Sequence, residues 1–123
     1  MATILVADDE KSVQNLLKVL LESERYSVII ARNGIDAVAL AKSVQPNCAI
    51  VDLMLPPTEG ITVSENLKKL AGCEKLPIII YTGRNDIPQK RQEKLAERFG
   101  AFLEKPADTA TLLLTIKKLL TPI

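Results

Sequence analysis

The stretch Cys48-Ala-Ile-Val-Asp52-Leu-Met-Leu-Pro56-Pro57 decides the fold class of this chain. Four apolar residues run without alternation into an aspartate. A continuous apolar run of this length is typical of a strand that is buried on both faces of a parallel sheet. Two prolines then interrupt the chain. The stretch therefore predicts a central strand over residues 48–51 that ends in a carboxylate.

Similar runs recur on both sides of this stretch, and amphipathic helical patterns separate them. Strands are expected at residues 4–7, 27–31, 48–51, 77–81 and 101–103. The expected apolar stripes of the helices are Val13, Leu16, Leu17 and Leu20; Ala37, Val38, Ala41 and Val44; Val63, Leu67 and Leu70; and Leu112, Ile116, Leu119 and Ile123. Strict alternation of strand and helix predicts an α/β fold, with a five-stranded, doubly wound parallel sheet and helices on both faces.

Two helix starts carry capping signals. Asn33 precedes a helical pattern in which Asp36 takes the third position. Asp86 is followed by Ile-Pro-Gln, which resembles a capping box with proline in the first turn. This pattern predicts a charged helix from Asp86 to Phe99 that has few apolar residues to bury and is therefore a candidate mobile element.

Composition narrows the classes of function. The chain has 123 residues, 47% of them hydrophobic and 25% charged, with a formal net charge of +1. This balance disfavours a disordered chain and a nucleic-acid binder that relies on bulk positive charge. No apolar run approaches the ~20 residues that span a bilayer. The chain contains no histidine, which excludes histidine-based catalysis and a role as a histidine phosphocarrier.

Chemically versatile residues follow the expected strands. Asp8 and Asp9 follow the first, Asp52 the third, Thr82 the fourth and Lys105 the fifth. The carboxyl ends of parallel strands meet at one edge, where ligands of open α/β sheets bind. Carboxylates gathered there repel one another without a cation, and their hard oxygens suit Mg²⁺. An aspartate can also act as a nucleophile toward phosphorus, with a lysine and a hydroxyl to stabilise the added charge.

Each residue also has a purely structural interpretation. Asp8 and Asp9 could favour a helix N-terminus, and Asp52 could belong to an ordinary turn. Thr82 could be a common β-branched strand residue, and Lys105 a solvated surface group. The two cysteines, Cys48 and Cys73, lack metal or redox spacing and suggest reduced thiols of a cytosolic protein.

Taken together, the segments resemble the receiver domain of two-component response regulators. The matching segments are Ile4–Glu10, Val51–Pro56 with Gly60, Ile79–Gly83 and Phe102–Pro106. The resemblance covers essentially the whole chain and implies a flavodoxin-like sheet with strand order 2-1-3-4-5 and five helices. It implies one receiver domain over residues 1–123, with no output domain in this chain.

The resemblance also implies the roles of the site residues. Asp52 would be the phosphoacceptor. The cofactor would be Mg²⁺ or Mn²⁺. Its ligands would be Asp9, Asp52 and the backbone carbonyl of Met54, together with Asp8 either directly or through a water molecule. Thr82, Lys105 and the aromatic Phe102 would stabilise the phosphoryl group or respond to it. The Lys105–Pro106 bond is expected to be cis.

The partners implied are a sensor histidine kinase or a His-phosphotransfer protein as donor, a downstream output protein, and a second copy of the chain as a homodimer. Neither nucleic acid nor membrane is implied as a direct partner, and the expected location is cytoplasmic. Output would pass through the fourth helix, the fifth strand and the fifth helix. There Leu114, Lys117 and Lys118 form a candidate partner face, although a single exposed leucine is also common on surfaces without any partner.

Several positions depart from the family pattern. Phe102 replaces the commoner tyrosine, Pro57 stands where glycine is frequent, and Ala107 stands where an aromatic residue is frequent. Gly100-Ala101 runs directly into Phe102, where many relatives have two more residues. We therefore expect an unusual turn into the fifth strand.

Three functions remain to be compared. The first is a phosphorelay switch that is not an enzyme, apart from Mg²⁺-dependent self-phosphorylation and slow self-dephosphorylation. The second is an aspartyl-phosphate phosphohydrolase, which is disfavoured because Met54 stands where such enzymes carry a second aspartate. The third is an interaction module of the same fold that works without phosphorylation.

Overall fold

A computed structural model describes residues 1–121. Its main sheet contains five parallel strands, which are β1 (Thr3–Ala7), β2 (Ser27–Ala31), β3 (Cys48–Val51), β6 (Ile78–Thr82) and β7 (Gly100–Glu104). The spatial order is β2-β1-β3-β6-β7. Counted among these five strands alone, this order is 2-1-3-4-5, so the expected fold class is confirmed.

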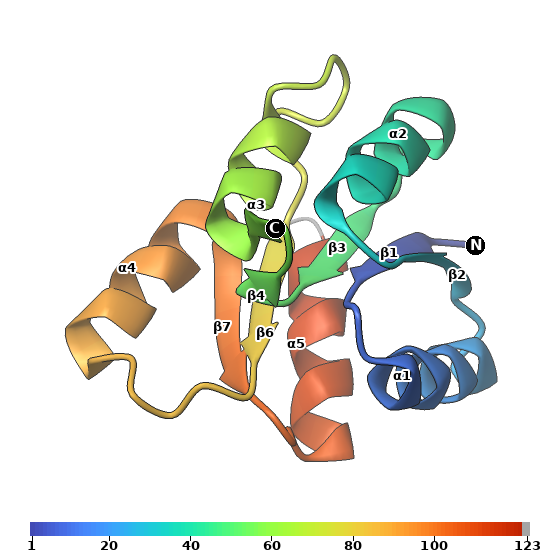
Figure 1. Ribbon diagram of the computed structural model, residues 1–123. Helices are drawn as coiled ribbons and strands as arrows, with labels where there is room; N and C mark the ends of the chain where they lie inside the picture. The colour runs from blue at the N-terminus through green and yellow to red at the C-terminus, as the bar shows by residue number, and fades with distance from the viewer. Residues whose placement is uncertain (122–123) are drawn as a thin grey trace.

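Helices cover both faces of the sheet. They are α1 (Lys11–Ser23), α2 (Gly34–Val44), α3 (Gly60–Lys68), α4 (Gln89–Phe99) and α5 (Thr109–Leu120). Helices α1 and α5 pack on one face, and α2, α3 and α4 pack on the other (Figure 1). Each face of the sheet therefore has its own apolar core.

The central strands are buried as their continuous apolar runs predict. Every residue of β3 and β6 is buried, and so are the last four residues of β1. Alternate side chains of one strand enter opposite cores: Ile50 packs with α1 and α5, whereas Val51 packs with the α2–α4 side. Burial on both faces thus fixes the register of the strands that carry the site.

The predicted apolar stripes of the helices agree with the observed burial only in part. Leu17, Val63, Leu112 and Ile116 are buried, but Leu16 is 65% exposed and Val44 is 43% exposed. In α1 the buried positions are Gln14, Leu17 and Leu21, a stripe shifted from the expected one. Several neighbouring apolar residues made two stripes available in this helix, and packing selected one. The stripe residue Ile123 lies outside the described residues.

The two capping predictions have opposite outcomes. The Asn33 side chain accepts a hydrogen bond from the Asp36 amide at 2.9 Å, as expected. The Asp86 prediction is wrong, because α4 begins at Gln89 after Pro88. The Asp86 carboxylate instead accepts hydrogen bonds from Arg84, at 3.0 Å from Nε and 2.9 Å from Nη2. A local charged partner therefore replaced the expected cap.

A short hairpin follows β3 and was not predicted. Strands β4 (Met54–Leu55) and β5 (Thr58–Glu59) pair antiparallel around the cis-linked Pro56-Pro57. Gly60 then donates its amide to the Leu53 carbonyl at 2.8 Å. A Cβ at Gly60 would lie 1.9 Å from the Asp52 carbonyl oxygen, so only glycine allows this close return of the chain.

The joint between α4 and β7 contains no loop. The helix ends at Phe99, and the strand begins at Gly100, whose φ is +151°. A Cβ at Gly100 would lie 2.9 Å from the Ile78 carbonyl oxygen. The helix can therefore continue directly into the strand because Gly100 adopts a backbone conformation that other residues rarely adopt.

Two further features concern the described chain as a whole. No helix within residues 1–121 combines the length and apolar character that crossing a membrane requires. Cys48 and Cys73 are buried free thiols. Burial raises the pKa of Cys48 to about 12, which keeps this thiol neutral near neutral pH.

Candidate functional site

Four residues predicted from the sequence meet at the carboxyl edge of the sheet. Asp8 follows β1, Asp52 follows β3, Thr82 ends β6, and Lys105 follows β7. Asp8 is 2% exposed, Asp52 is 5% exposed and Thr82 is fully buried. Charged residues are rarely buried to this extent unless they are paired, so the arrangement must contain compensating contacts.

Lys105 provides the compensation. Its Nζ atom lies 2.7 Å from Asp8 Oδ2 and 2.8 Å from Asp52 Oδ2. The side chain of Lys105 is 12% exposed, so little water competes for these contacts. The ammonium therefore holds together two carboxylates that would otherwise repel one another.

Burial and hydrogen bonding together shift the pKa values of Asp8 and Lys105. Burial raises the pKa of Asp8, and the hydrogen bonds from Lys105 and from the Glu10 amide oppose this rise without cancelling it. Burial lowers the pKa of Lys105, but hydrogen bonds to Asp52 and Asp8 outweigh it and raise the pKa overall. Lys105 is therefore charged throughout the physiological pH range.

Backbone amides orient the two carboxylates. The Glu10 amide donates to Asp8 Oδ1 at 2.9 Å, and the Met54 amide donates to Asp52 Oδ1 at 3.0 Å. Buried Gln14 donates from Nε2 to the Asp8 carbonyl at 2.6 Å. Sequence reasoning missed Gln14, although a polar residue within an apolar helix stripe is a detectable signal.

The acidic group differs from the set expected from the sequence. Carboxylate oxygens of Asp8, Glu10 and Asp52 lie within 4.8 Å of one another. Asp9 is exposed and lies outside this group, but it lines the same open pocket of about 310 Å³ with Glu10, Asp52 and Met54. The donors are all oxygens, which is the chemistry that hard divalent cations require.

Thr82 ends β6, the strand next to β3, and Phe102 lies on β7, one strand farther from Asp52. The Thr82 hydroxyl oxygen accepts a hydrogen bond from the Arg84 amide at 3.2 Å, and its proton remains available for donation. Phe102 is half-buried and packs against the core on the α4 side, level with Ile80 of β6. The Lys105–Pro106 peptide bond is cis.

Sequence reasoning also missed Tyr81. Its ring is 5% exposed, and Lys105 Nζ lies 5.6 Å from the ring centroid. Its hydroxyl accepts a hydrogen bond from the Ala107 amide at 3.1 Å. Tyr81 therefore supports Lys105 and the turn that follows it. The only signal in the sequence was an aromatic hydroxyl at the end of an apolar strand.

The candidate partner face lies apart from this edge. Leu114 is 58% exposed on α5, and Lys117 and Lys118 are exposed on its last turn. Their spacing of three and four residues makes them neighbours on the helix surface. An apolar side chain is therefore exposed beside two positive charges, and the role of this face in binding a partner stays a prediction.

Comparisons with known proteins agree with this architecture. A family model described as the response regulator receiver domain matches residues 4–117. Protein PilH of Pseudomonas aeruginosa is 35% identical, and the match covers 98% of each chain. The transcriptional regulator RpaA of Synechocystis is 32% identical, but the match covers 49% of that protein. The structure of chemotaxis protein CheY4 of Vibrio cholerae aligns with a TM-score of 0.86 at 29% identity, over 98% of this chain and 99% of the other.

Proposed function

Because this chain belongs to the response regulator receiver family, we propose that it works as a phosphorelay switch in which Asp52 accepts the phosphoryl group. The observation that supports this most is the pairing of buried Asp52 with Lys105 at 2.8 Å, beside an open acidic pocket. The donor is a sensor histidine kinase or a His-phosphotransfer protein. We also propose a cytoplasmic location, in keeping with the two unpaired thiols.

The transfer consists of one displacement at phosphorus. An oxygen of Asp52 attacks the phosphorus of the donor phosphohistidine, an acyl–phosphate bond forms, and the phosphorus–nitrogen bond breaks with the electron pair going to the imidazole. The Met54 amide holds the other Asp52 oxygen at 3.0 Å and so fixes the direction of attack. Lys105 stays protonated and can donate to a phosphoryl oxygen.

The residues of the pocket fit a divalent cation. Mg²⁺ or Mn²⁺ would be held by Asp8, Asp9, Asp52 and the Met54 carbonyl, and when bound it would neutralise charge on the phosphoryl group. Glu10 joins this set as a candidate, because its carboxylate lies in the compact acidic group. The oxygen-only donor set supports this assignment.

Phosphorylation would be read at a distant surface. Added negative charge beside Thr82 would favour donation from its hydroxyl to the phosphoryl group, and Phe102 on the adjacent strand would repack. The affected surface is formed by α4, β7 and α5, with Leu114, Lys117 and Lys118 toward a downstream protein or a second copy of this chain. Receiver domains are signalling switches rather than conventional enzymes, and the catalysis that we propose is limited to Mg²⁺-dependent self-phosphorylation and slow self-dephosphorylation.

Intact-mass measurement tests the acceptor chemistry. The protein is incubated with acetyl phosphate and Mg²⁺, with and without a chelator, alongside Asp52→Asn and the control Asp108→Asn. We expect one added phosphoryl group in the wild type and in Asp108→Asn, dependent on the metal and absent from Asp52→Asn. Labelling that persists in Asp52→Asn would reject this acceptor. Absence of labelling in a folded protein, with acetyl phosphate and with a phosphorylated histidine donor, would favour the phosphorylation-independent module.

A further inference from the structure

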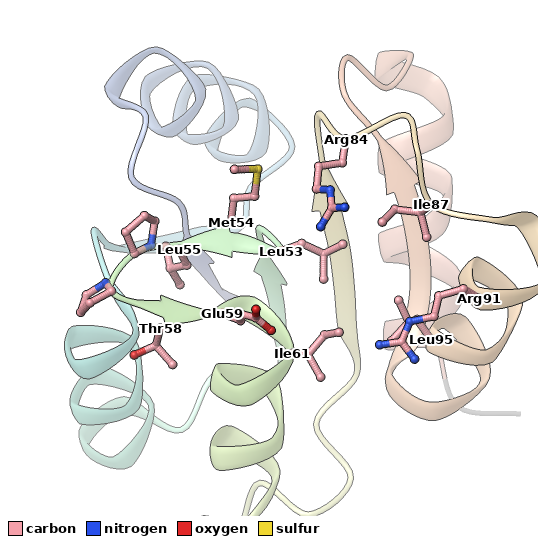
Figure 2. Close-up of a pocket in the computed structure, with 12 residues that line it drawn as sticks. Leu53, Met54, Leu55, Thr58, Glu59, Ile61, Arg84, Ile87, Arg91 and Leu95 are labelled. Atoms are coloured by element: carbon pink, nitrogen blue, oxygen red, sulfur yellow. The ribbon is translucent and has the colours of Figure 1, made fainter.

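A second pocket lies beside the acceptor site and is not used by the proposed switch. It has a volume of about 420 Å³ and lies, open to solvent, between the segment Leu53–Ile61 and helix α4 (Figure 2). The β4–β5 hairpin and the start of α3 form one wall, and α4 with the loop before it forms the other. This volume falls within the ~300–1,000 Å³ that is typical of small-molecule sites.

The most buried side chains that line this pocket are apolar. Leu53 and Leu95 are 8% and 3% exposed, and half-buried Ile61 and Ile87 complete the lining from opposite walls. These side chains come from four separate elements or loops and face a common space (Figure 2). An apolar group of a ligand that entered this space would lose contact with water, which favours binding.

One uncompensated cation stands at the same pocket. Arg91 extends from α4 toward Ile61 (Figure 2), and no carboxylate within residues 1–121 forms an ion pair with it. The other lining arginine, Arg84, is already held by Asp86 at 2.9 Å. Arg91 can therefore offer its planar guanidinium to an incoming acid group. Glu59 lies on the opposite wall, and its carboxylate would repel a ligand whose negative charge extended to that side of the pocket.

We propose that this pocket binds a small amphipathic organic anion, with its apolar body between Leu53, Ile61 and Leu95 and its acid group on Arg91. Charge complementarity with Arg91 favours an anion over a neutral or cationic ligand. The volume favours a small molecule over a side chain of a partner protein. One leucine-sized side chain would fill only part of this volume.

Ligand occupancy would be sensed at the acceptor site. Met54, Pro56 and Arg84 line both this pocket and the acidic pocket around Asp52. A ligand that repositions these residues would change access to Asp52 and hence the rate of phosphoryl transfer. This regulatory consequence rests on the proposed function, whereas ligand binding itself does not.

Binding is tested with 8-anilinonaphthalene-1-sulfonate, a fluorescent amphipathic anion, titrated into unphosphorylated protein without divalent cation. We expect Arg91→Gln to weaken affinity about tenfold, as loss of a charge-assisted hydrogen bond predicts. Lys94→Gln makes the same change in charge on α4 outside the pocket lining and should leave affinity within about twofold. Glu59→Gln should tighten binding, because it removes the opposing charge.

The dye also binds partly folded proteins, so circular dichroism and thermal unfolding must show that each variant is native. Amide chemical-shift changes on dye addition should centre on Ile61, Ile87 and Leu95. Equal affinity in Arg91→Gln and wild type, shift changes centred elsewhere, or no binding at millimolar dye would overturn the proposal.

The two proposals fail in distinguishable ways. Dye binding that responds to Arg91→Gln, together with absent labelling by acetyl phosphate, would retain the pocket and reject the acceptor chemistry. Normal labelling with no dye binding would support the acceptor chemistry and reject the ligand-binding pocket. Labelling whose rate is unaffected by saturating dye would retain binding and reject the regulatory consequence.

Discussion

The acceptor edge, by which we mean the carboxyl edge of the sheet around Asp52, differs from helix α4 in the burial of its charged side chains. At the acceptor edge, Asp8, Asp52 and Lys105 are largely buried and compensate one another at 2.7–2.8 Å. On α4, charged side chains are exposed, and only Leu95 and Phe99 are fully buried. Buried charges depend strongly on their partners, whereas exposed charges hardly affect stability. The acceptor edge is therefore restricted in composition, while the surface of α4 can vary with the partner or ligand.

The largest effect is expected from removing the shared cation. Lys105→Met leaves two buried carboxylates without compensation, so we expect a loss of about 4 kcal/mol in the free energy of unfolding. The measurement is urea denaturation at pH 7 without divalent cations. Lys90→Met on α4 is the matched control and should change stability by less than about 0.5 kcal/mol. Similar losses in the free energy of unfolding for the two variants would show that a buried charge at the acceptor edge matters no more for stability than an exposed charge on α4.

The next effect tests how α4 is attached. Leu95→Ala removes one of its two buried anchors and should lower the free energy of unfolding by about 3 kcal/mol, as expected for a buried leucine. Native-state amide exchange should accelerate in α4 more than in β3. Lys94→Ala, one position earlier and exposed, should leave both quantities nearly unchanged. If exchange accelerates equally in β3 and α4, α4 is not an independently weak element.

The smallest effect on stability is expected at the exposed pair formed by Arg84 and Asp86. Hydrogen bonding to Arg84 lowers the pKa of Asp86, yet the two side chains are 45% and 64% exposed, so solvent screens their attraction. Asp86→Asn should leave the urea midpoint unchanged within error. It should also release Arg84 toward the neighbouring pocket and tighten binding of the dye. A lower urea midpoint with unchanged dye affinity would contradict both expectations.

The sequence predicted the elements whose burial determines their residue types. Continuous apolar runs predicted the positions of β3 and β6. The polar residues at the ends of these runs, Asp52 and Thr82, were thereby predicted at the carboxyl edge of the sheet. Glu10, Gln14 and Tyr81 were missed because their contacts depend on the path of loops and on side-chain direction. Whether Asp9 binds the metal remains a prediction.

The wrong predictions arose where the local sequence allowed two alternatives. In α1, the neighbouring Leu16 and Leu17 offered alternative stripes, and packing against the sheet selected Leu17. Asp86 could cap a helix or accept hydrogen bonds from Arg84, and in the structure it accepts those from Arg84. The β4–β5 hairpin has two residues in each strand, too few for a periodic pattern to be detected.

The loop-free joint at Gly100 has a mechanical consequence. A linker would let a helix tilt while its neighbouring strand stayed in place, because extra residues absorb the displacement. Here the last turn of α4 leads directly into a residue paired with Ile78, so no linker residues separate the helix from the strand. A displacement of the end of α4 would therefore act directly on β7, the strand that carries Phe102 two residues after Gly100.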